Sequence, residues 1–420
     1  MNRPCIHVHP LPNERRGPWL AVRAQISGHP RRRRRNGEVY FEVPDQFDQW
    51  TALCGDVEDR HDVWLRSAIF PAMEAGYDLV IHGNVSAGLL ANVEVYQTII
   101  ANWWSQYQVV NVSAEQEIAG AAKLAPTDAL LTFSGGLDSI YTLYCHQRRL
   151  RGRNSRQIPL CIFVHGYDIP LWDVSFQNAF ERARRIVESL GSQLAPVRTN
   201  LREMLPAWPE CYPTALAAVL SLFSRRFAEG LVASSVTYRH DRLHEGGYGS
   251  SPTSDWLLSS HDFRITHDLA NATRVEKTQV LYDCETAQAN LRVCWAGDDL
   301  STNCGVCPKC LWQMLCMKAV GLTDLRAFEH PLNAERVALM PVASRVHWDD
   351  LAACLDYARQ AGRGELKEFV ALAHALQVSP MAAARRDPVQ TPHAEPGRSG
   401  LVRRTASQLA RLVVRSKPAA

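Results

Sequence analysis

The stretch Ala129-Leu-Leu-Thr-Phe-Ser-Gly-Gly-Leu-Asp-Ser139 decides the expected fold, because it predicts a buried strand, a glycine turn and the start of a helix. Gly135 and Gly136 let the backbone turn sharply and bring N–H groups close to an anion. The helix expected at 140–149 adds unpaired N–H donors and the positive end of its dipole. No Walker lysine follows, so this loop differs from the one that holds the β- and γ-phosphates in kinases and GTPases. The alternative is a glycine-rich turn without chemical use.

The sequence after this stretch alternates between expected strands and expected helices. The strands are expected at 129–133, 160–164, 195–198 and 230–234, and the helices at 140–149, 175–190 and 213–226. Such alternation predicts an α/β fold with a parallel, doubly wound, Rossmann-like sheet and right-handed crossovers. Ligands of these sheets lie at the carboxyl ends of the strands, where the strand order reverses.

The chain has 420 residues, enough for two or three domains with a core each. We expect an N-terminal α/β extension at 1–122, the loop-bearing domain at 123–325, a helical region at 326–378 and a basic flexible tail at 379–420. In the outer units, strands are expected at 19–26, 38–43 and 79–81, and helices at 92–107, 348–360 and 365–376.

The composition is that of an ordinary globular protein, with 46% apolar and 21% charged residues. The formal net charge is +3, and the last forty residues contribute +6 of it, from eight Lys/Arg against two acidic residues. The remainder is slightly acidic, so we do not expect nucleic acid as a partner. Arg31–Arg35 could contact phosphate, although an exposed hairpin tip is the preferred interpretation. A basic amphipathic helix at 401–415 could bind a membrane, a nucleic acid or a partner, with a solvated tail preferred.

The start of the chain lacks an apolar stretch of signal-peptide length, and no run of eighteen apolar residues occurs. We therefore expect a cytoplasmic protein without a membrane span. Disulfides are rare in that compartment, so eight of the twelve cysteines are interpreted as small buried residues.

The other four cysteines, Cys294, Cys304, Cys307 and Cys310, form a C-x9-C-x2-C-x2-C pattern. Four thiols at this spacing can close a tetrahedron around a borderline-soft cation, with Gly305 allowing the tight turn. Zinc is favoured over an iron–sulfur cluster, and a structural role is expected because no coordination position stays open. Four unrelated core cysteines are the alternative.

Ser134-Gly-Gly-Leu-Asp-Ser139 matches the Ser-Gly-Gly-x-Asp-Ser signature, which arises by chance in about one chain in two thousand of this length. It resembles the loop of the PP-loop ATP pyrophosphatases. That resemblance implies attack of a substrate oxygen on the α-phosphate of ATP, giving an adenylate and pyrophosphate, after which a nitrogen or sulfur nucleophile displaces AMP. The serines supply hydroxyls, and Asp138 can cap the helix or help to hold Mg²⁺.

The loop followed about 155 residues later by the cysteine knuckle resembles the layout of the 7-cyano-7-deazaguanine synthases (QueC-like enzymes). The resemblance covers about 128–322. It includes Cys294-Trp-Ala and Cys304-Gly-Val-Cys-Pro-Lys-Cys310, and Thr273-Arg-Val-Glu-Lys277 is similar to the family's Thr-Lys-Ala-Glu segment. The resemblance implies ATP, Mg²⁺ and Zn²⁺ as cofactors.

The residues expected to bind the nucleotide follow from the loop and its neighbouring strand: Phe133, Ser134, Gly135, Gly136, Leu137, Asp138, Ser139 and Val164. The expected catalytic residues are Asp138, Lys277, His165 and Asp168. Lys277 would stabilise the phosphate of the adenylate, with a solvated helix lysine as the alternative. His165 and Asp168 would act as general bases or orient substrate, with a plain strand-end role as the alternative for His165.

Two segments depart from the family pattern. His165-Gly-Tyr-Asp168 stands where the family has an Asp-Tyr-Gly-Gln-Arg-His type of segment, and 247–255 lacks its Asp-Tyr-Ser-x-Tyr-Pro-Asp pattern. We still expect His165, Asp168 and the 248–255 loop to face the same crevice as Ser134. The departures leave the substrate and the acceptor open.

Three functions are compatible with the sequence. The first is a ligase that adenylates a small carboxylate, with 7-carboxy-7-deazaguanine as the leading candidate, and transfers it to an amine. In anti-phage defence operons that amine could belong to a partner protein, docked on the N-terminal extension. The second is a sulfurtransferase acting on a nucleobase or tRNA, with Cys145, Cys161 or Cys211 as catalytic thiol. The third is a nucleotide-regulated scaffold. The oligomeric state stays open, a homodimer being one option.

Overall fold

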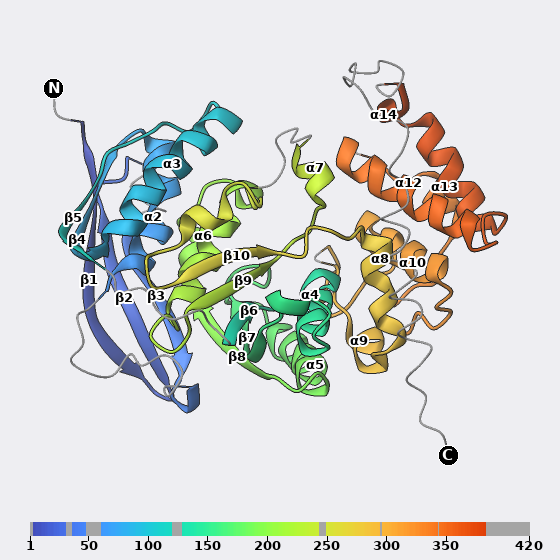
Figure 1. Cartoon of the computed structure of the whole chain (residues 1–420), viewed down its shortest axis with the longest axis horizontal. Coiled ribbons are helices and arrows are strands. Elements are labelled where there is room, and N and C mark those ends of the chain that lie inside the picture. Colours follow the sequence, from blue (N-terminus) through green and yellow to red (C-terminus); the bar gives the residue numbers. More distant parts are fainter. Residues whose placement is uncertain are drawn as a thin grey trace.

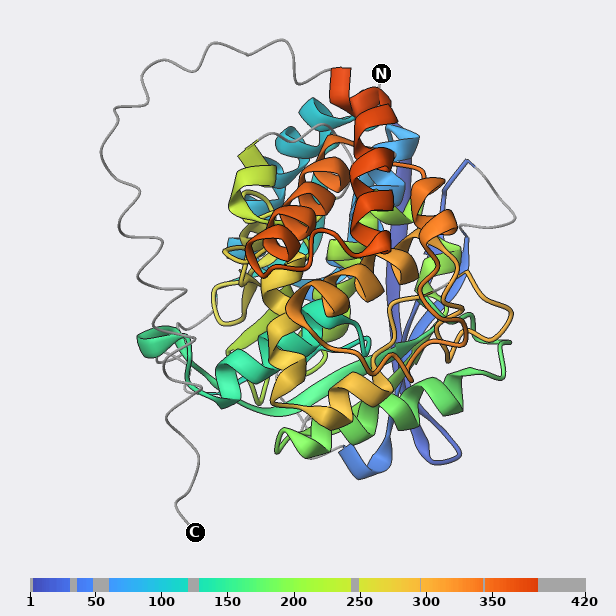
Figure 2. The ribbon, with the colours of Figure 1, turned by 90° about the vertical axis from the view of Figure 1, so that its right-hand side faces the viewer.

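A computed structural model describes residues 3–30, 36–47, 60–119, 128–242, 249–294, 296–342 and 344–383. The arginine run at 31–35 and the basic helix expected at 401–415 lie outside these residues. One mostly parallel sheet of ten strands organises the fold, with the strand order β10-β9-β6-β7-β8-β3-β2-β1-β4-β5. Helices cover it (Figures 1 and 2). The expected α/β class is confirmed, and the arrangement is compatible with a Rossmann-like fold.

The half of the sheet that carries the glycine loop is fully parallel and doubly wound. Its strands are β6 (Asp128–Thr132), β7 (Gln157–His165), β8 (Gln193–Thr199), β9 (Glu229–Ala233) and β10 (Arg264–Asp268). The connecting helices are α4 (Leu137–Gln147), α5 (Phe176–Ser189) and α6 (Trp208–Ser221). From β6 the chain adds β7 and β8 on one side and later β9 and β10 on the other, so the strand order reverses at β6.

Alternation along β6 builds a core on each face of this half-sheet. Leu130 belongs to the core that includes α6, whereas Ala129 and Leu131 belong to the core that includes α4 and α5. All three side chains are fully buried. A strand buried on both faces is typical of parallel sheets covered by helices, and it explains why this stretch is a continuous apolar run.

The N-terminal residues extend the same sheet. They form β1 (Cys5–Arg16), β2 (Trp19–Ser27), β3 (Gly37–Pro44), β4 (Asp78–Ser86) and β5 (Val112–Ile118), with η1 (Asp45–Phe47), α2 (Asp62–Ala75) and α3 (Ala87–Trp103). β3 pairs antiparallel with β8, with Phe41 opposite Thr199 and Glu42 opposite Arg198. The sheet therefore runs across the expected boundary between 122 and 123, while the division into domains stays a prediction.

Four short elements lie between the strands and helices of the loop-bearing half: η2 (Gly152–Asn154), η3 (Leu201–Glu203), α7 (Tyr238–Arg242) and η4 (Asp255–Leu258).

The C-terminal part is helical, as expected. Its elements are α8 (Arg274–Thr278), η5 (Gln279–Tyr282), α9 (Glu285–Asn290), α10 (Pro308–Val320), α11 (Ala334–Ala338), α12 (Arg345–Gln360), α13 (Lys367–Val378) and α14 (Pro380–Ala383). α10 and α12 lie against each other, at the opposite end of the molecule from β1 (Figure 1). None of the described helices is long and apolar enough to cross a membrane.

Two helices, α6 and α3, differ from their expected limits by four residues or more. α6 begins at Trp208, five residues before the expected start, and it holds Pro213 in its interior. Pro209 occupies the first turn, where a missing N–H costs nothing, so the helix begins there. α3 runs over 87–103 instead of 92–107.

Candidate nucleotide site and metal centre

The glycine loop forms the sharp turn that its sequence predicts. It joins the end of β6 to α4, with Gly135 at φ 78° and Gly136 as the extended N-cap residue of α4. The backbone N–H of Gly136 donates to Ser134 Oγ at 3.3 Å, and Ser139 Oγ donates to the Gly136 carbonyl at 2.9 Å. Because a side chain at a positive φ is strained, the turn requires glycine at 135.

A buried arginine that the sequence did not single out lies against this loop. The Arg292 backbone N–H donates to the Gly135 carbonyl at 2.9 Å, and its Nε donates to the Ser134 carbonyl at 3.3 Å. A Cβ on Gly135 would lie 3.6 Å from the Arg292 Cβ. Burial lowers the pKa of Arg292, and the negative charge of Asp168 opposes that shift. The loop is therefore held from outside by a cationic side chain and its backbone.

Lys277 joins the first turn of α4 to the end of β9. Its Nζ donates to Asp138 Oδ1 at 2.8 Å and to the carbonyl of Ser234, the residue that follows β9. Since β6 and β9 flank the point where the strand order reverses, this ammonium bridges the position where ligands of such sheets bind. Lys277 is only 2% exposed, so the alternative of a solvated helix lysine is wrong.

Asp138 is surrounded by positive charge. Arg274 Nη1 lies 3.6 Å from Asp138 Oδ2, on the other side from Lys277. Burial would raise the pKa of Asp138, but the charges of Lys277 and Arg274 outweigh it and hold that pKa below its usual value. The carboxylate is therefore ionised and paired.

A capping box fixes the short helix that carries both cations. The backbone N–H of Glu276 donates to Thr273 Oγ1, and the backbone N–H of Thr273 donates to Glu276 Oε2 at 2.8 Å. Arg274 is held in turn by Gln313 Oε1 at 3.0 Å and by the face of Trp312, whose ring centroid lies 4.6 Å from its Cζ. Thr273 and Glu276 thus cap the helix. Its basic residues, Arg274 and Lys277, lie beside Asp138.

A second lysine adds to the charge beside the loop. Burial and the charge of Arg274 together lower the pKa of Lys309 to about 8, against the opposing charges of Asp168 and Asp138. Asp168 is half-buried, and its catalytic role stays a prediction.

His165 makes contacts that are local to the end of β7. Its Nε2 donates to the Pro170 carbonyl at 3.0 Å, and its ring stacks on Phe176 with the centroids 3.9 Å apart. Burial lowers its pKa. These contacts match the strand-end alternative, and a catalytic role for His165 stays a prediction. Of the neighbouring nucleotide-site predictions, Phe133 is buried in the core and Val164 is half-buried.

The expected substrate loop at 248–255 is described from Gly249 onward. Ser250 Oγ donates to Asp255 Oδ2 at 2.7 Å, and His267 Nδ1 lies 2.8 Å from the same oxygen. Ser251 donates to Asp241 of α7. Among the described residues, these hydrogen bonds tie the segment to β10 and α7 and do not reach 134–139. Its place at the crevice stays a prediction.

Two adjacent carboxylates of α12 and one histidine of α7 lie near the same cations. His240 Nδ1 is 3.9 Å from Asp350 Oδ1, and His240 Nε2 is 3.9 Å from Asp349 Oδ2. The pKa of Asp350 is raised to about 7. Burial is the main cause, Asp138 adds to it, and the charges of Arg274 and Lys277 oppose it. No local motif marks these residues in the sequence. The packing of α12 on α8 brings the two carboxylates near Arg274 and Lys277.

The free energy of unfolding of wild type is expected to fall as the pH rises from about 4 to 7 and Asp350 ionises, and replacing Asp350 with Asn should remove this fall. The folded pKa of about 7 lies above the usual value near 3.9, so the stabilising contribution of the protonated group is present below about pH 4 and lost as the pH rises through 7. The variant should therefore gain roughly 2–4 kcal/mol relative to wild type between pH 5 and pH 8 in urea unfolding. Asp356→Asn, an exposed site on the same helix, is the control. Equal pH dependence in wild type and D350N would contradict this.

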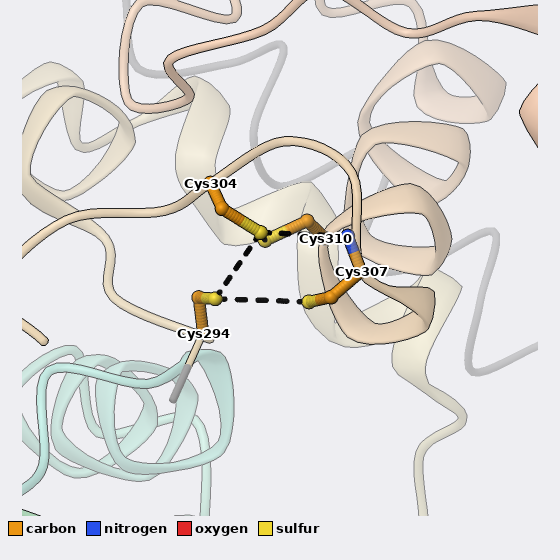
Figure 3. A group of neighbouring side chains, drawn as sticks. All are labelled: Cys294, Cys304, Cys307 and Cys310. Carbon is orange, nitrogen blue, oxygen red and sulfur yellow. Dashed lines mark hydrogen bonds between the residues drawn. The ribbon is translucent and has the colours of Figure 1, made fainter. Parts of the chain in front are cut away.

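The four cysteines of the knuckle converge (Figure 3). The Sγ atom of Cys294 lies 3.5 Å from that of Cys304 and 3.7 Å from that of Cys307, and Cys304 and Cys310 are 3.9 Å apart. All four sulfur atoms lie within 4.8 Å of one another, and the eleven described cysteines are free of disulfides. Hydrogen bonds from the Cys307 and Cys310 thiols lower the pKa of Cys294. This cluster could bind a metal ion such as zinc.

Asn303, another residue that the sequence did not single out, fixes the knuckle from within. It is fully buried, and its Oδ1 accepts from the backbone N–H groups of Val293 and Cys294 at 2.8 and 3.1 Å. Its Nδ2 donates to the carbonyls of Leu291 and Ala327. Gly305 has φ 72°, and a Cβ there would lie 2.4 Å from the His330 carbonyl oxygen, so the turn requires glycine.

Comparison with known proteins found no match for this chain among family models, curated proteins or solved structures.

Proposed function

We propose that this chain is a PP-loop ATP pyrophosphatase that adenylates a small carboxylate, releases pyrophosphate, and passes the acyl group to an amine with release of AMP. The observation that carries the proposal is the bridge from Asp138 through Lys277 to Ser234, at the reversal of strand order and directly beside a glycine loop. A phosphate bound by the loop would meet backbone N–H groups and a buried ammonium together.

The cations around the loop have separate roles in this proposal. The backbone of 135–139 and the exposed Ser134 hydroxyl would bind phosphate oxygens. Lys277 would stabilise charge at the α-phosphate as the carboxylate oxygen attacks, because a fixed buried cation costs no reorganisation at that moment. Arg292 would hold the loop in shape through its two hydrogen bonds to 134 and 135.

The described residues fit Zn²⁺ better than they fit Mg²⁺. The four thiols fit Zn²⁺, which would supply a closed structural site. For Mg²⁺ the residues present do not fit well, because both carboxylate oxygens of Asp138 face cations, Lys277 and Arg274.

The sulfurtransferase alternative is disfavoured by the surroundings of its three candidate thiols. Cys211 is fully buried, and burial raises the pKa of Cys145 to about 12 and raises that of Cys161. A thiol acts as a nucleophile only when it is ionised, and these environments oppose ionisation. We therefore retain transfer to an amine as the proposal.

The substrate test uses purified full-length protein with ATP and 7-carboxy-7-deazaguanine. We expect AMP and pyrophosphate in equal amounts, at a rate that rises by at least about ten-fold when the acid is added, because adenylation requires its carboxylate. The measurement is chromatography of the nucleotides, with the decarboxylated base as control. AMP release that is indifferent to the acid would exclude this substrate, and a screen of other carboxylates would follow.

In this proposal the acceptor does not belong to this chain. It is either ammonia or an amine group of a partner protein of an anti-phage system. The long segment 1–122, which forms half of the strands of the sheet, supplies a surface beyond the nucleotide site for such a partner. Mass spectrometry of a co-expressed partner would detect the transferred group as an added mass on an amine. An unmodified partner together with a nitrile or amide product would assign ammonia instead.

A further inference from the structure

We propose that His7, His9 and His82 form a second transition-metal site, which takes Zn²⁺ or a similar cation through three imidazole nitrogens. The site lies on β1 and β4, in the N-terminal half of the sheet, and it is independent of the proposed ATP chemistry. Its ligand atoms all lie within 4.8 Å of one another.

The register of the sheet brings the three histidines to one face. β1 and β4 are parallel, with His7 opposite Val80 and Val8 opposite Ile81. Because side chains alternate along a strand, His7, His9 and His82 share a face, and Val8 and Ile81 point to the other. The two apolar residues are fully buried in the core that includes α2 and α3, which lie on that side of the strands (Figure 1). The histidine face is the one turned away from this core.

The rings are close enough to share one ion after small adjustments. His7 Nδ1 lies 3.0 Å from His82 Nε2, and the rings of His9 and His82 stack with centroids 3.9 Å apart. Zinc binds imidazole nitrogen at about 2.0–2.1 Å, so ligands of a tetrahedral site stand about 3.3 Å from one another. The observed spacing is already near that value. A register shift in β4 between Ile81 and Asn84, the kind of irregularity that redirects a side chain, includes His82.

The surroundings of the three rings also favour a metal ion over a purely structural role. Neutral imidazole nitrogens are common metal ligands. Among the described residues, no carboxylate lies within ion-pair distance of the three rings. A stacked trio with one hydrogen bond gains little by itself, whereas a shared ion would satisfy all three nitrogens.

One more potential ligand lies on the same face. Val80 is opposite Ser113 of β5, so Glu115, two residues further on, shares the histidine face. Three imidazoles leave a fourth tetrahedral position for water, for this carboxylate or for a group from outside. Sites with an open position differ from the closed knuckle of four cysteines.

The test is a zinc titration of full-length protein whose cysteine knuckle is already loaded, by calorimetry at pH 7.5. We expect one further Zn²⁺ per chain, and binding at least about 100-fold weaker in His9→Ala and His82→Ala, because each variant removes a direct ligand, whose loss costs at least as much as that of an outer-shell partner. His374→Ala, an exposed histidine of α13, should bind as wild type does. Affinity should fall at pH 5.5, because protonated imidazole cannot bind the ion. Cobalt at this site should lack the thiolate charge-transfer absorption of the knuckle.

The zinc titration of the wild-type protein can overturn the proposal without any result from the variants. A chain that takes up no zinc beyond the knuckle has no second site. If His82→Gln folds, as judged by circular dichroism, and binds the second ion with wild-type affinity, the ion lies elsewhere. Neither result would affect AMP formation, so the proposed function is tested separately.

Discussion

Replacing Lys277 with Met is expected to reduce AMP formation from ATP by about 100- to 1,000-fold, the usual cost of removing one preorganised charge from a reacting centre. Lys277 is the buried cation that contacts both Asp138 and the carbonyl of Ser234. Methionine keeps most of the side-chain volume and removes only the ammonium. The rate is measured at saturating ATP and carboxylate, so that weaker binding does not obscure it.

The control for Lys277→Met is Lys367→Met, at an exposed position of α13, which should retain the full rate. Because the variant leaves Asp138 without one partner, its melting temperature must be compared with wild type. Lys277→Arg keeps the positive charge. Comparing its melting temperature with that of Lys277→Met shows whether a lower rate of AMP formation comes from a loss of folding or from the missing charge. Folded Lys277→Met with a rate within about three-fold of wild type would remove Lys277 from the mechanism.

Asp138→Asn separates an enzyme from a scaffold. Its side chain keeps the shape but loses the charge that pairs with Lys277 and Arg274. We expect ATP turnover to be lost. If biological activity nevertheless persists, the nucleotide-regulated scaffold is the better interpretation.

Local patterns in the sequence predicted the parts of the site that are themselves local. The strand–glycine–helix stretch at 129–139 and the knuckle at 294–310 depend on near neighbours, on glycine conformations and on short spacing. Both occur as expected, with positive φ at Gly135 and Gly305. Lys277 was predicted because Thr273–Lys277 resembles a segment of the family, and in the structure Thr273 and Glu276 of that segment form the capping box of α8.

Long-range packing supplied what the sequence did not show. Arg292 is brought to Gly135, and Asp350 to the cations of α8, by segments far apart in the chain, and neither has a pattern of its own. The pairing of β3 with β8 likewise joins residues near 41 and 199. α2 was missed because nearly every position of 62–73 is buried, which leaves no polar face and hence no helical period to detect.

Keeping the cysteine knuckle free of metal is expected to abolish AMP formation, although no hydrogen bond among the described residues joins a cysteine to the glycine loop. The path between them is short. Cys294 is two residues after Arg292, whose backbone N–H donates to Gly135, and Asn303 holds the backbone of 293 and 294. Without an ion, four clustered thiols lose the bonds that fix them, so this segment should loosen and release the loop. Binding free energy at structural zinc sites is also folding free energy, about 10 kcal/mol or more.

The experiment compares wild type with Cys307→Ser and with a control, Cys5→Ser, whose cysteine lies on β1. Metal content by mass spectrometry should be one zinc lower in Cys307→Ser than in the control, and AMP formation should fall by more than about 100-fold together with the melting temperature. Chelator-treated wild type should lose activity and regain it with added Zn²⁺. Brown protein containing iron and sulfide would instead identify a cluster and favour sulfur transfer. Full activity in metal-free protein would show that Arg292 holds the loop without help from the knuckle, because the hydrogen bond to Gly135 would then survive the loss of the ion.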